Sequence, residues 1–358
     1  WSVTERLSLR AALRWSTTSK RFTGSDSRIR RADLEAAQRG AFVQQLSADD
    51  LGAPAAYRNY PAMQRASFEG EPVDFDQLLP SVVLGYRTER SKWYYSLQRG
   101  HKAGGFNFRL NGLDAGTLRY DDEDVIAHEL GFNALLLDGR LRTRVALFAS
   151  DYRDLQQNSN RGDDGVISAA VIRNAARASS RGLETELTFS PSPAWELRLA
   201  ASWLEAEFES YHGADCTRLQ SVVSATSVGA NFGARRERNR CAQDLGGART
   251  PHAPSSAGRL GITRHVEFAG LQVAATLEWY HSEAFFTSPH ADPLRRQPAF
   301  DKLNARVSFG SGRWSAAIVG TNLTDEFTAR QLGQDGNAAV SGLIDQPRRL
   351  RAQFRYEF

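Results

Sequence analysis

Few residues in this chain have the types and spacing that catalysis or metal binding requires. No two of its seven histidines lie at metal-ligand spacing, and none lies at such spacing from a cysteine. We expect loop and surface positions for these histidines, which are His101, His128, His212, His252, His265, His281 and His290. The sequence also contains no nucleophile elbow, phosphate-binding loop or dinucleotide fingerprint. It thus predicts a protein that is not an enzyme, with no catalytic residue, cofactor or metal.

Paired carboxylates are the remaining candidates for acid–base chemistry. Glu184 and Glu186 lie two residues apart in an alternating segment, which in a strand places both on one face about 7 Å apart. That arrangement suits general acid–base catalysis. The alternative, which we favour, is that both carboxylates accept hydrogen bonds from arginines on the same face or from a domain packed against it.

The composition excludes several classes of protein. The 358 residues include 45 Lys+Arg and 41 Asp+Glu, a formal charge of +4, which is too small a surplus to indicate nucleic-acid binding. The length suggests two or three globular domains or one large barrel. No apolar run approaches the roughly eighteen residues of a membrane-spanning helix. A transmembrane β-barrel stays possible, because alternating strands hide their apolar residues from any average.

Alternation of apolar and polar residues is the strongest pattern in the chain. Leu350, Ala352, Phe354, Tyr356 and Phe358 alternate with polar residues up to the last position, which predicts a strand with one apolar face. Twelve segments are predicted as strands in this way: 7–16, 82–87, 93–97, 130–136, 141–147, 183–189, 197–203, 260–262, 273–279, 303–309, 314–318 and 350–358.

Short and long connections alternate between these segments. The short ones are 88–91, 138–139, 190–194, the stretch near Glu267, and 310–312, and Asp138-Gly139 is a strong hairpin signal. The long ones run over about 21–78, 101–123, 156–168, 209–253, 285–298 and 325–346. Short turns on one side and long polar loops on the other are typical of an outer-membrane barrel whose short turns face the periplasm.

A soluble all-β protein also has alternating strands, but two features favour the barrel. Aromatic residues gather at the ends of apolar faces, as in the girdles at membrane interfaces: Trp15, Tyr86, Trp93, Phe189, Trp195, Trp203, Trp279, Phe309, Trp314 and Phe358. The opposite faces carry charge: Arg14, Arg87, Glu129, Arg142, Arg144, Glu184, Glu186, Glu196, Arg198, Glu278, Arg306, Arg351 and Arg355. A barrel with a water-filled lumen predicts both features.

Five short motifs also point to a known family. They are RGHKAGGFN at 99–107, SDYRDLQ at 150–156, NAAR at 174–177, RGLE at 181–184 and NLTDE at 322–326. In order and spacing they resemble the C-terminal barrel of TonB-dependent outer-membrane receptors, and the last is similar to the family's closing hairpin. The resemblance extends over the whole chain.

The resemblance implies an antiparallel all-β barrel of twenty-two strands that encloses an N-terminal plug, preceded by a segment that binds the energy-transducing protein TonB. The twelve strands here resemble the last twelve of the family. Residues 1–358 are therefore expected to be a fragment of a longer chain, without the plug, the TonB-contacting segment or the signal peptide, and no secretion signal is visible at Trp1.

The resemblance also implies a location and a function. It places the chain in the outer membrane of a Gram-negative bacterium, in contact with lipid, and implies TonB-energised uptake of a scarce nutrient, above all an iron–siderophore complex. The alternative is a self-contained twelve-stranded barrel that acts as a passive channel or a membrane-embedded hydrolase.

Cys216 and Cys241 bracket an arginine-rich stretch in a long loop that is extracellular in such a receptor. In this oxidising setting we expect them to form a disulfide. The arginines between them are predicted to help capture an anionic ligand such as a ferric siderophore: Arg235, Arg236, Arg238 and Arg240. The alternative is a solvated loop without a specific partner.

The end of the chain carries a further expectation. Resemblance to outer-membrane proteins implies that Phe354, Tyr356 and Phe358 are read by the barrel-assembly machinery, because an apolar edge strand is recognisable before it pairs. The alternative is that Phe358 is only the last girdle residue. The apolar residues of this strand should face lipid or a neighbouring subunit, and the alternate residues the lumen.

Overall fold

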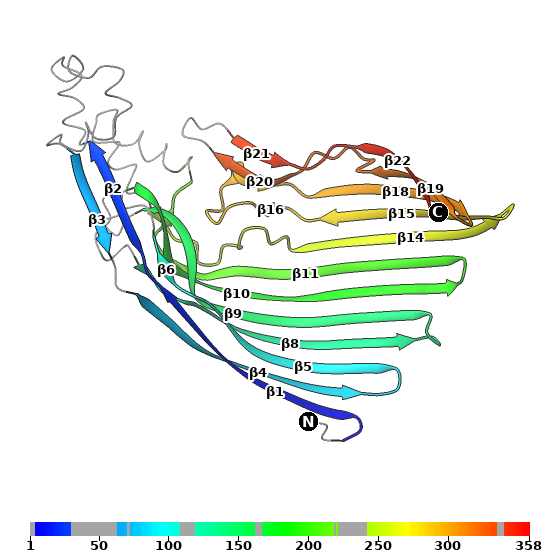
Figure 1. Ribbon diagram of the computed structural model, residues 1–358, viewed down its shortest axis with the longest axis horizontal. Helices are drawn as coiled ribbons and strands as arrows, with labels where there is room; N and C mark the ends of the chain where they lie inside the picture. The colour runs from blue at the N-terminus through cyan, green and yellow to red at the C-terminus, as the bar shows by residue number, and fades with distance from the viewer. Residues whose placement is uncertain are drawn as a thin grey trace, which may run out of the picture.

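The computed structural model describes residues 4–29, 63–69, 72–107, 119–161, 167–217, 220, 242–334 and 340–358. Within them, twelve strands form one antiparallel sheet in sequence order (Figure 1). They are β1 (Leu7–Lys20), β4 (Val73–Arg87), β5 (Ser91–Lys102), β8 (Glu123–Leu136), β9 (Leu141–Arg161), β10 (Ile167–Ser192), β11 (Trp195–Tyr211), β14 (Ser256–Phe268), β15 (Leu271–Ser282), β18 (Phe300–Ser311), β19 (Trp314–Thr321) and β22 (Arg349–Tyr356). The predicted all-β fold and strand order are confirmed.

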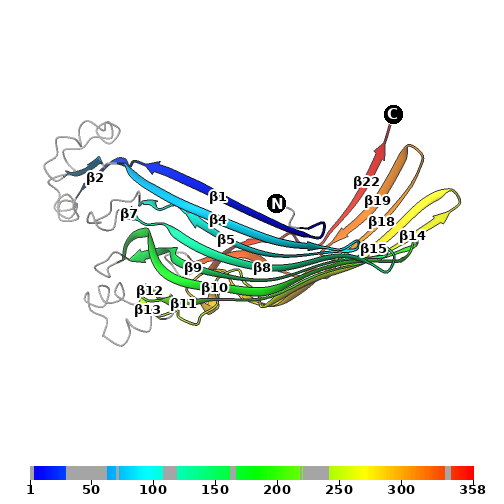
Figure 2. The ribbon, with the colours of Figure 1, turned by 90° about the horizontal axis from the view of Figure 1, so that it is seen from below.

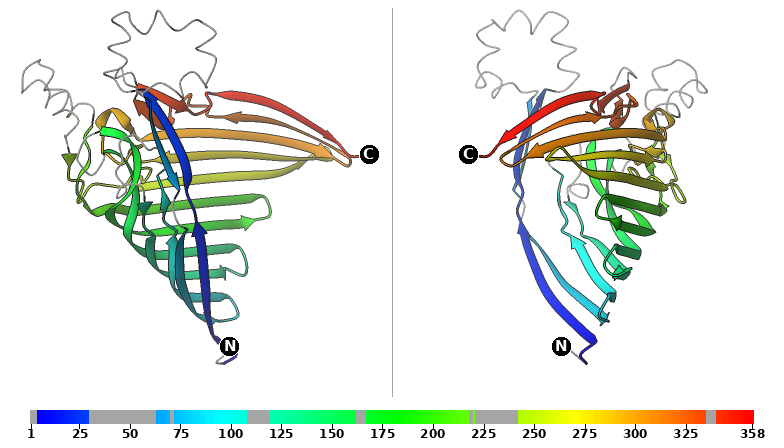
Figure 3. Two further views of the ribbon diagram at one scale, coloured as in Figure 1. Left: turned by 60° about the vertical axis from the view of Figure 1, so that its left-hand side comes forward. Right: turned by 90° about the vertical axis from the view of Figure 1, so that its right-hand side faces the viewer.

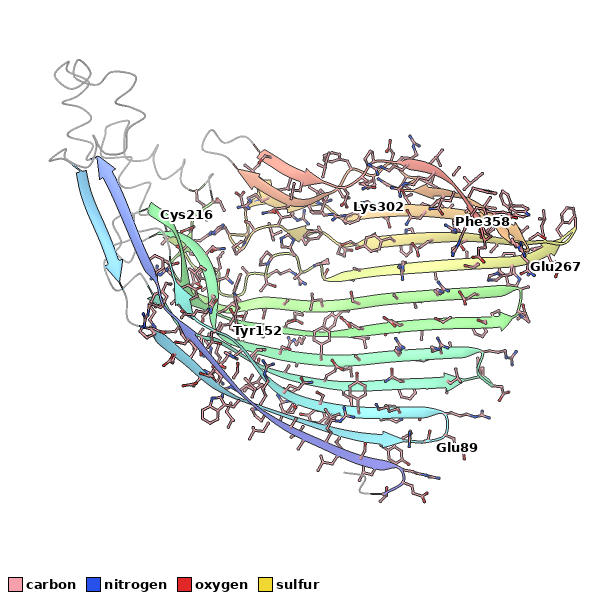
Figure 4. The ribbon with its side chains drawn as sticks, in the orientation of Figure 1. Glu89, Tyr152, Cys216, Glu267, Lys302 and Phe358 are labelled. Atoms are coloured by element: carbon pink, nitrogen blue, oxygen red, sulfur yellow. The ribbon has the colours of Figure 1, made fainter. Side chains whose placement is uncertain are left out.

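Short turns and long connections alternate between neighbouring strands. The short turns lie at one end of the sheet, where Glu89, Glu267 and Phe358 are found, whereas Cys216 lies at the other end (Figure 4). The long connections form small two-stranded sheets: β2 (Thr23–Ile29) with β3 (Met63–Glu69), β6 (Gly105–Phe106) with β7 (Arg119–Tyr120), β12 (Ala214–Asp215) with β13 (Ala242–Gln243), β16 (Phe285–Phe286) with β17 (Arg296–Gln297), and β20 (Ala329–Gln334) with β21 (Val340–Ile344). A single-turn 3-10 helix, η1 (Pro293–Arg295), precedes β17.

The strand register gathers the apolar residues on one face of the sheet. Direct partners on seven successive strands form one row: Leu9, Leu84, Tyr95, Leu130, Leu147, Leu183 and Trp203. At the far edge, Ile318 of β19 lies between Val307 of β18 and Ala352 of β22. Apart from Leu9, which is half-buried, these side chains are exposed. Leu147 exposes 51% of its surface, and Leu350, also on β22, exposes 72%. Such a face matches the lipid-facing band of a transmembrane barrel.

The sheet is curved, and its polar face is the concave one. Figures 2 and 3 show the curvature, with the blue N-terminal strand and the red C-terminal strand at the two edges. Polar-face residues from seven neighbouring strands, β5 to β15, line a single hollow, an arrangement that only a concave face allows. The lumen side of the barrel wall is therefore the charged side.

Several strands extend further toward the long connections than the sequence predicted. β1 extends to Lys20, which pairs with Val73. β4 therefore begins at Val73, within the loop that was expected over 21–78. β9 and β10 likewise continue through most of the loop expected over 156–168. The alternation ends earlier than the strand because, beyond the apolar band, neither face has to be apolar, while the backbone ladder still satisfies the peptide groups.

The β8–β9 turn is longer than the Asp138-Gly139 dipeptide that predicted it. Leu136 pairs with Leu141, so four residues make the connection. Leu137, Asp138 and Gly139 all have positive φ, of 52°, 55° and 89°. Gly139 adopts this conformation without a steric cost because it has no Cβ.

The main cluster of buried apolar side chains among the described residues lies at the long-connection end. It consists of Ala176, Ala178, Phe208, Tyr211, Ala214 and Leu245. These residues join β10 and β11 to the connection between β11 and β14, so this part of the mouth has a small core of its own.

No helix in the described part of the chain has the length and apolarity needed to cross a membrane.

Candidate functional site

Polar groups from several strands converge on the lumen side of the sheet. The hollow on this face has a volume of ≈ 540 Å³. Its polar lining residues are Tyr94, Glu129, Asn133, Arg144, Glu184, Thr185, Glu186, Ser202, Arg259 and Tyr280. They come from consecutive strands and are held in place by the strand register, so the wall offers a fixed pattern of donors and acceptors.

Opposite charges on this face of the sheet are paired across neighbouring strands. Arg144 Nη1 lies 3.4 Å from Glu186 Oε2, and Arg259 Nε lies 3.5 Å from Glu278 Oε1. For Glu186, the hydrogen bond from Arg144 is the arrangement that we favoured over acid–base catalysis. Glu184 lines the same hollow, opposite Ala146 and Ser202 on the two neighbouring strands.

The connection that contains Cys216 forms part of the mouth at the other end of the lumen. Cys216 is disulfide-bonded. The only other cysteine of the sequence, Cys241, lies outside the described residues, as do the predicted ligand-capturing residues Arg235, Arg236, Arg238 and Arg240. The pairing of Cys216 with Cys241 and the role of the arginines stay predictions.

Asp215 and His290 bring two long connections together beside Cys216. Ser159 Oγ of β9 lies 3.1 Å from Asp215 Oδ1, and His290 Nε2 lies 3.7 Å from Asp215 Oδ2. Burial lowers the pKa of His290, while the negative charge of Asp215 acts in the opposite direction. A lowered pKa keeps the imidazole neutral at neutral pH.

The last long connection is tied to the barrel wall by a charged network. Lys302 of β18 donates to Asp345 Oδ2 at 2.9 Å and to Thr328 Oγ1 at 2.6 Å, and Arg330 also donates to Asp345. Burial opposes ionisation of Asp345, but the bonds from Lys302, Arg330 and Thr328 outweigh it and lower the pKa of this carboxyl to about 2.

Two asparagines in the family-like motifs have structural roles that the sequence did not reveal. Asn322, with a φ of 49°, accepts from Glu326 N at 2.9 Å and donates to Gln346 O at 3.2 Å, which folds the chain after β19. Asn174 donates to the carbonyls of Asp121 and Asp154, both at 2.8 Å. The motifs NLTDE and NAAR marked both asparagines. The bond between Asn322 and Glu326 lies within its motif, whereas the bonds to Gln346, Asp121 and Asp154 join residues 20 or more positions apart.

Four of the seven histidines lie in strands of the main sheet and not in loops as expected: His101, His128, His265 and His281. Besides His290, three histidines in the described part of the chain contact an acidic or phenolic side chain. His212 Nδ1 lies 3.0 Å from Asp244 Oδ2, His281 Nδ1 lies 3.0 Å from Asp301 Oδ1, and His128 Nδ1 lies 2.8 Å from Tyr95 Oη. Among the described residues, no three or more His, Cys, Asp or Glu side chains are grouped as metal ligands.

The end of the chain is an exposed edge. Within the described residues β22 pairs only with β19. Phe354 exposes 72% of its surface, and Phe358 is fully exposed. The ring of Phe354 stacks on that of Trp314, with centroids 6.5 Å apart. On the opposite face Gln353 accepts from Arg306, so apolar and polar residues of β22 lie on the two faces as predicted.

A curved sheet that is apolar outside, charged inside, and bounded by short turns at one end and long connections at the other is a wall of an outer-membrane β-barrel. A family model described as "TonB dependent receptor-like, beta-barrel" matches residues 1–323. The chain belongs to this family, whose barrels lie in the outer membrane of Gram-negative bacteria.

Solved structures of larger receptors share this fold. The ferric yersiniabactin uptake receptor FyuA from Yersinia pestis has a TM-score of 0.68 and 17% identity, and covers 100% of this chain and 44% of its own. The ferric-catecholate import receptor Fiu from E. coli K12 has a TM-score of 0.63 and 14% identity, with coverage of 99% and 43%. The copper transporter OprC has a TM-score of 0.62 and 12% identity, with coverage of 100% and 48%. The chain thus spans less than half the length of each.

Proposed function

We propose that this chain is part of an outer-membrane receptor that imports a scarce, bulky nutrient with energy supplied through TonB, and that the nutrient is an iron–siderophore complex. The observation that carries the proposal is the family's barrel wall, with a continuous apolar exterior and a charged lumen face. FyuA and Fiu are described as receptors for ferric siderophores, which supports this ligand. OprC is described as a copper transporter, and the fold alone does not select the cargo.

The described sheet is proposed to be about half of a larger barrel, with residues 1–358 forming a C-terminal fragment of it. β1 and β22 are its free edges within the described residues, and unpaired backbone groups are costly in lipid. Further strands, the plug and the segment that contacts TonB would come from the rest of the receptor. The match with FyuA supports this proposal, because it covers all of this chain but only 44% of FyuA.

The alternative of a self-contained barrel, acting as a channel or a hydrolase, requires β1 to pair with β22. These strands stand at opposite ends of the described sheet. No observation favours this alternative.

Uptake of labelled iron tests the proposal. The complete gene is deleted in the native bacterium, and uptake of ⁵⁵Fe is measured from a panel of ferric siderophores at low iron. We expect loss of uptake for at least one siderophore, and the same loss when TonB is removed. Unchanged iron uptake together with impaired copper uptake would indicate that the cargo is copper and not an iron–siderophore complex. If uptake through this receptor continues after TonB is removed, the TonB-energised mechanism is contradicted.

The arginine-rich loop offers a second test of ligand capture. Replacing Arg235, Arg236, Arg238 and Arg240 with glutamine should lower the affinity for an anionic ferric siderophore, most strongly at low salt, where charges are least screened. Arg140 and Arg313 in short turns at the opposite end serve as a matched control. An equal effect of both sets of substitutions would exclude a specific role for the loop.

A further inference from the structure

Residues 285–298, here called the bridging segment, lie between two other connections at the mouth. The first is the Cys216 loop, meaning residues 212–217 and 242–253, and the second is the terminal hairpin β20–β21. Within this segment, β17 and η1 contact β20. Its contacts include hydrogen bonds on both sides and apolar packing on the side of the Cys216 loop.

The contacts with the terminal hairpin come from three side chains. Thr287 Oγ1 accepts from Leu332 N at 3.1 Å, and Arg295 Nε donates to Leu332 O at 2.6 Å. Gln297 Oε1 accepts from Ala329 N at 2.7 Å. Thr287 and Gln297 expose only 5% and 4% of their surface, so water does not readily replace these bonds when they break.

The contacts with the Cys216 loop lie on the other side of the segment. Gln243 Nε2 donates both to His290 O, at 3.1 Å, and to Asp215 O, at 2.7 Å. His252 N donates to Phe286 O at 2.8 Å. Ala291 packs against the buried cluster that contains Phe208 and Tyr211. The bridging segment is therefore anchored to the strands through this loop as well as through its own ends.

The bridging segment itself is held in one shape. β16 and β17 pair, with Phe285 opposite Gln297, and Thr287 Oγ1 donates to Arg295 O at 3.0 Å. Asp292, which exposes 2% of its surface, caps η1 by accepting from Leu294 N at 3.0 Å. A segment that is braced internally transmits a displacement at one side to the other.

We propose that the bridging segment couples the Cys216 loop to the terminal hairpin, so that the two open and close as one body at the mouth, with Thr287 as a positioning residue. This inference rests on the proposed function and deepens it. If the Cys216 loop or the terminal hairpin binds the ligand, the other one should become less mobile as well. Coupling of this kind is reciprocal, so loosening either side should loosen both.

Hydrogen exchange of the complete receptor in lipid nanodiscs tests the coupling. Thr287→Val keeps the shape of the side chain and removes its hydroxyl, whereas Thr287→Ser keeps the hydroxyl. In Thr287→Val we expect about tenfold faster exchange of amides in β20–β21 and also in β12–β13, which Thr287 does not contact. Thr287→Ser should restore the slow exchange in both places.

A second pair of variants protects the test against a failure of assembly. Arg295→Met removes the bond to Leu332 O and should accelerate exchange at the same two places. Arg296→Met changes the adjacent, exposed arginine, for which no side-chain hydrogen bond is found within the described residues, and should leave exchange unchanged. Faster exchange confined to β20–β21 in both Thr287→Val and Arg295→Met would overturn the coupling. Because this measurement needs no ligand, its failure is distinguishable from failure of the uptake experiment.

Discussion

Lys302 Nζ of β18 lies 2.9 Å from Asp345 Oδ2, and this ion pair joins the lumen wall to the end of the last long connection. The side chains of Lys302 and Asp345 expose only 15% and 22% of their surface, so the pair is better shielded from solvent than a typical surface salt bridge. Lys302 and Asp345 are 43 residues apart in sequence, so the pair is a long-range contact that ties the end of the terminal hairpin back to β18.

The pKa of Asp345 gives this pair a testable pH dependence. The pKa is about 2 in the folded protein, against about 3.9 for an unfolded aspartate. A lowered folded pKa stabilises the protein above the unfolded pKa, and this stabilisation is lost as the pH falls toward 2. Asp345→Asn should therefore lower the free energy of unfolding by about 2 kcal/mol at pH 7, and the difference should vanish near pH 2.

Guanidinium unfolding of the complete receptor in lipid vesicles, repeated from pH 7 to pH 2, measures this difference. Asp325→Asn is the matched control, since Asp325 pairs with Arg348 at 3.3 Å in a more exposed setting. A destabilisation by Asp345→Asn that is independent of pH would show that the ion pair is not its source.

The two faces of the sheet predict opposite outcomes for arginine at adjacent positions. Leu147 lies in the apolar row, whereas Ala146 faces the lumen directly opposite Glu184. An arginine near the bilayer midplane of a barrel costs about 2–4 kcal/mol. Leu147→Arg should therefore destabilise the receptor by about that amount, while Ala146→Arg should be nearly neutral because the new charge meets Glu184. Urea unfolding in lipid vesicles compares them, and equal destabilisation would place both faces in similar surroundings.

The fold was predictable from sequence because lipid imposes a simple pattern. Between two membrane interfaces each strand must be apolar on its outer face, so residues such as Leu147 and Leu183 mark the strand, its face and its place in the order. The predicted strand ends fail where this pressure stops, as at Lys20 and Val73, which pair beyond the apolar band.

The mouth could not be predicted in the same way. Its bonds join side chains to remote backbone groups: Thr287 Oγ1 accepts from Leu332 N, and Asn174 donates to Asp121 O. Such partners depend on which connections pack together, and no periodicity in the sequence records that. The sequence predicted that Arg144 and Glu186 lie on the same polar face, but not that they form an ion pair with each other.

The disulfide at Cys216 leads to a chemical prediction. Cys216 is disulfide-bonded, and Cys241 is the only other cysteine in the sequence. Non-reducing mass mapping of the exported receptor should find one peptide pair containing both residues. Cys216→Ser should destabilise the loop, since closure of a loop of this size contributes about 3–4 kcal/mol in the chain-entropy model, and should leave the short-turn end unchanged. Two free thiols in the exported protein would refute the pairing.

Two variants distinguish whether Phe358, at the exposed end of β22, is an assembly signal or only a membrane anchor. Phe358 is fully exposed beyond the end of β22, and Phe268 exposes 72% of its surface at another short turn. If Phe358 is read by the assembly machinery, its deletion from the complete receptor should cause unfolded precursor to accumulate in the periplasm, because an unpaired apolar edge must be captured before it pairs elsewhere. Phe268→Ala removes a comparable exposed ring from an internal turn and should still allow insertion, with only a small loss of stability. Cell fractionation with heat-modifiability on gels measures both. Normal insertion of the receptor without Phe358 would show that this residue is only a girdle anchor, with the same role as Phe268.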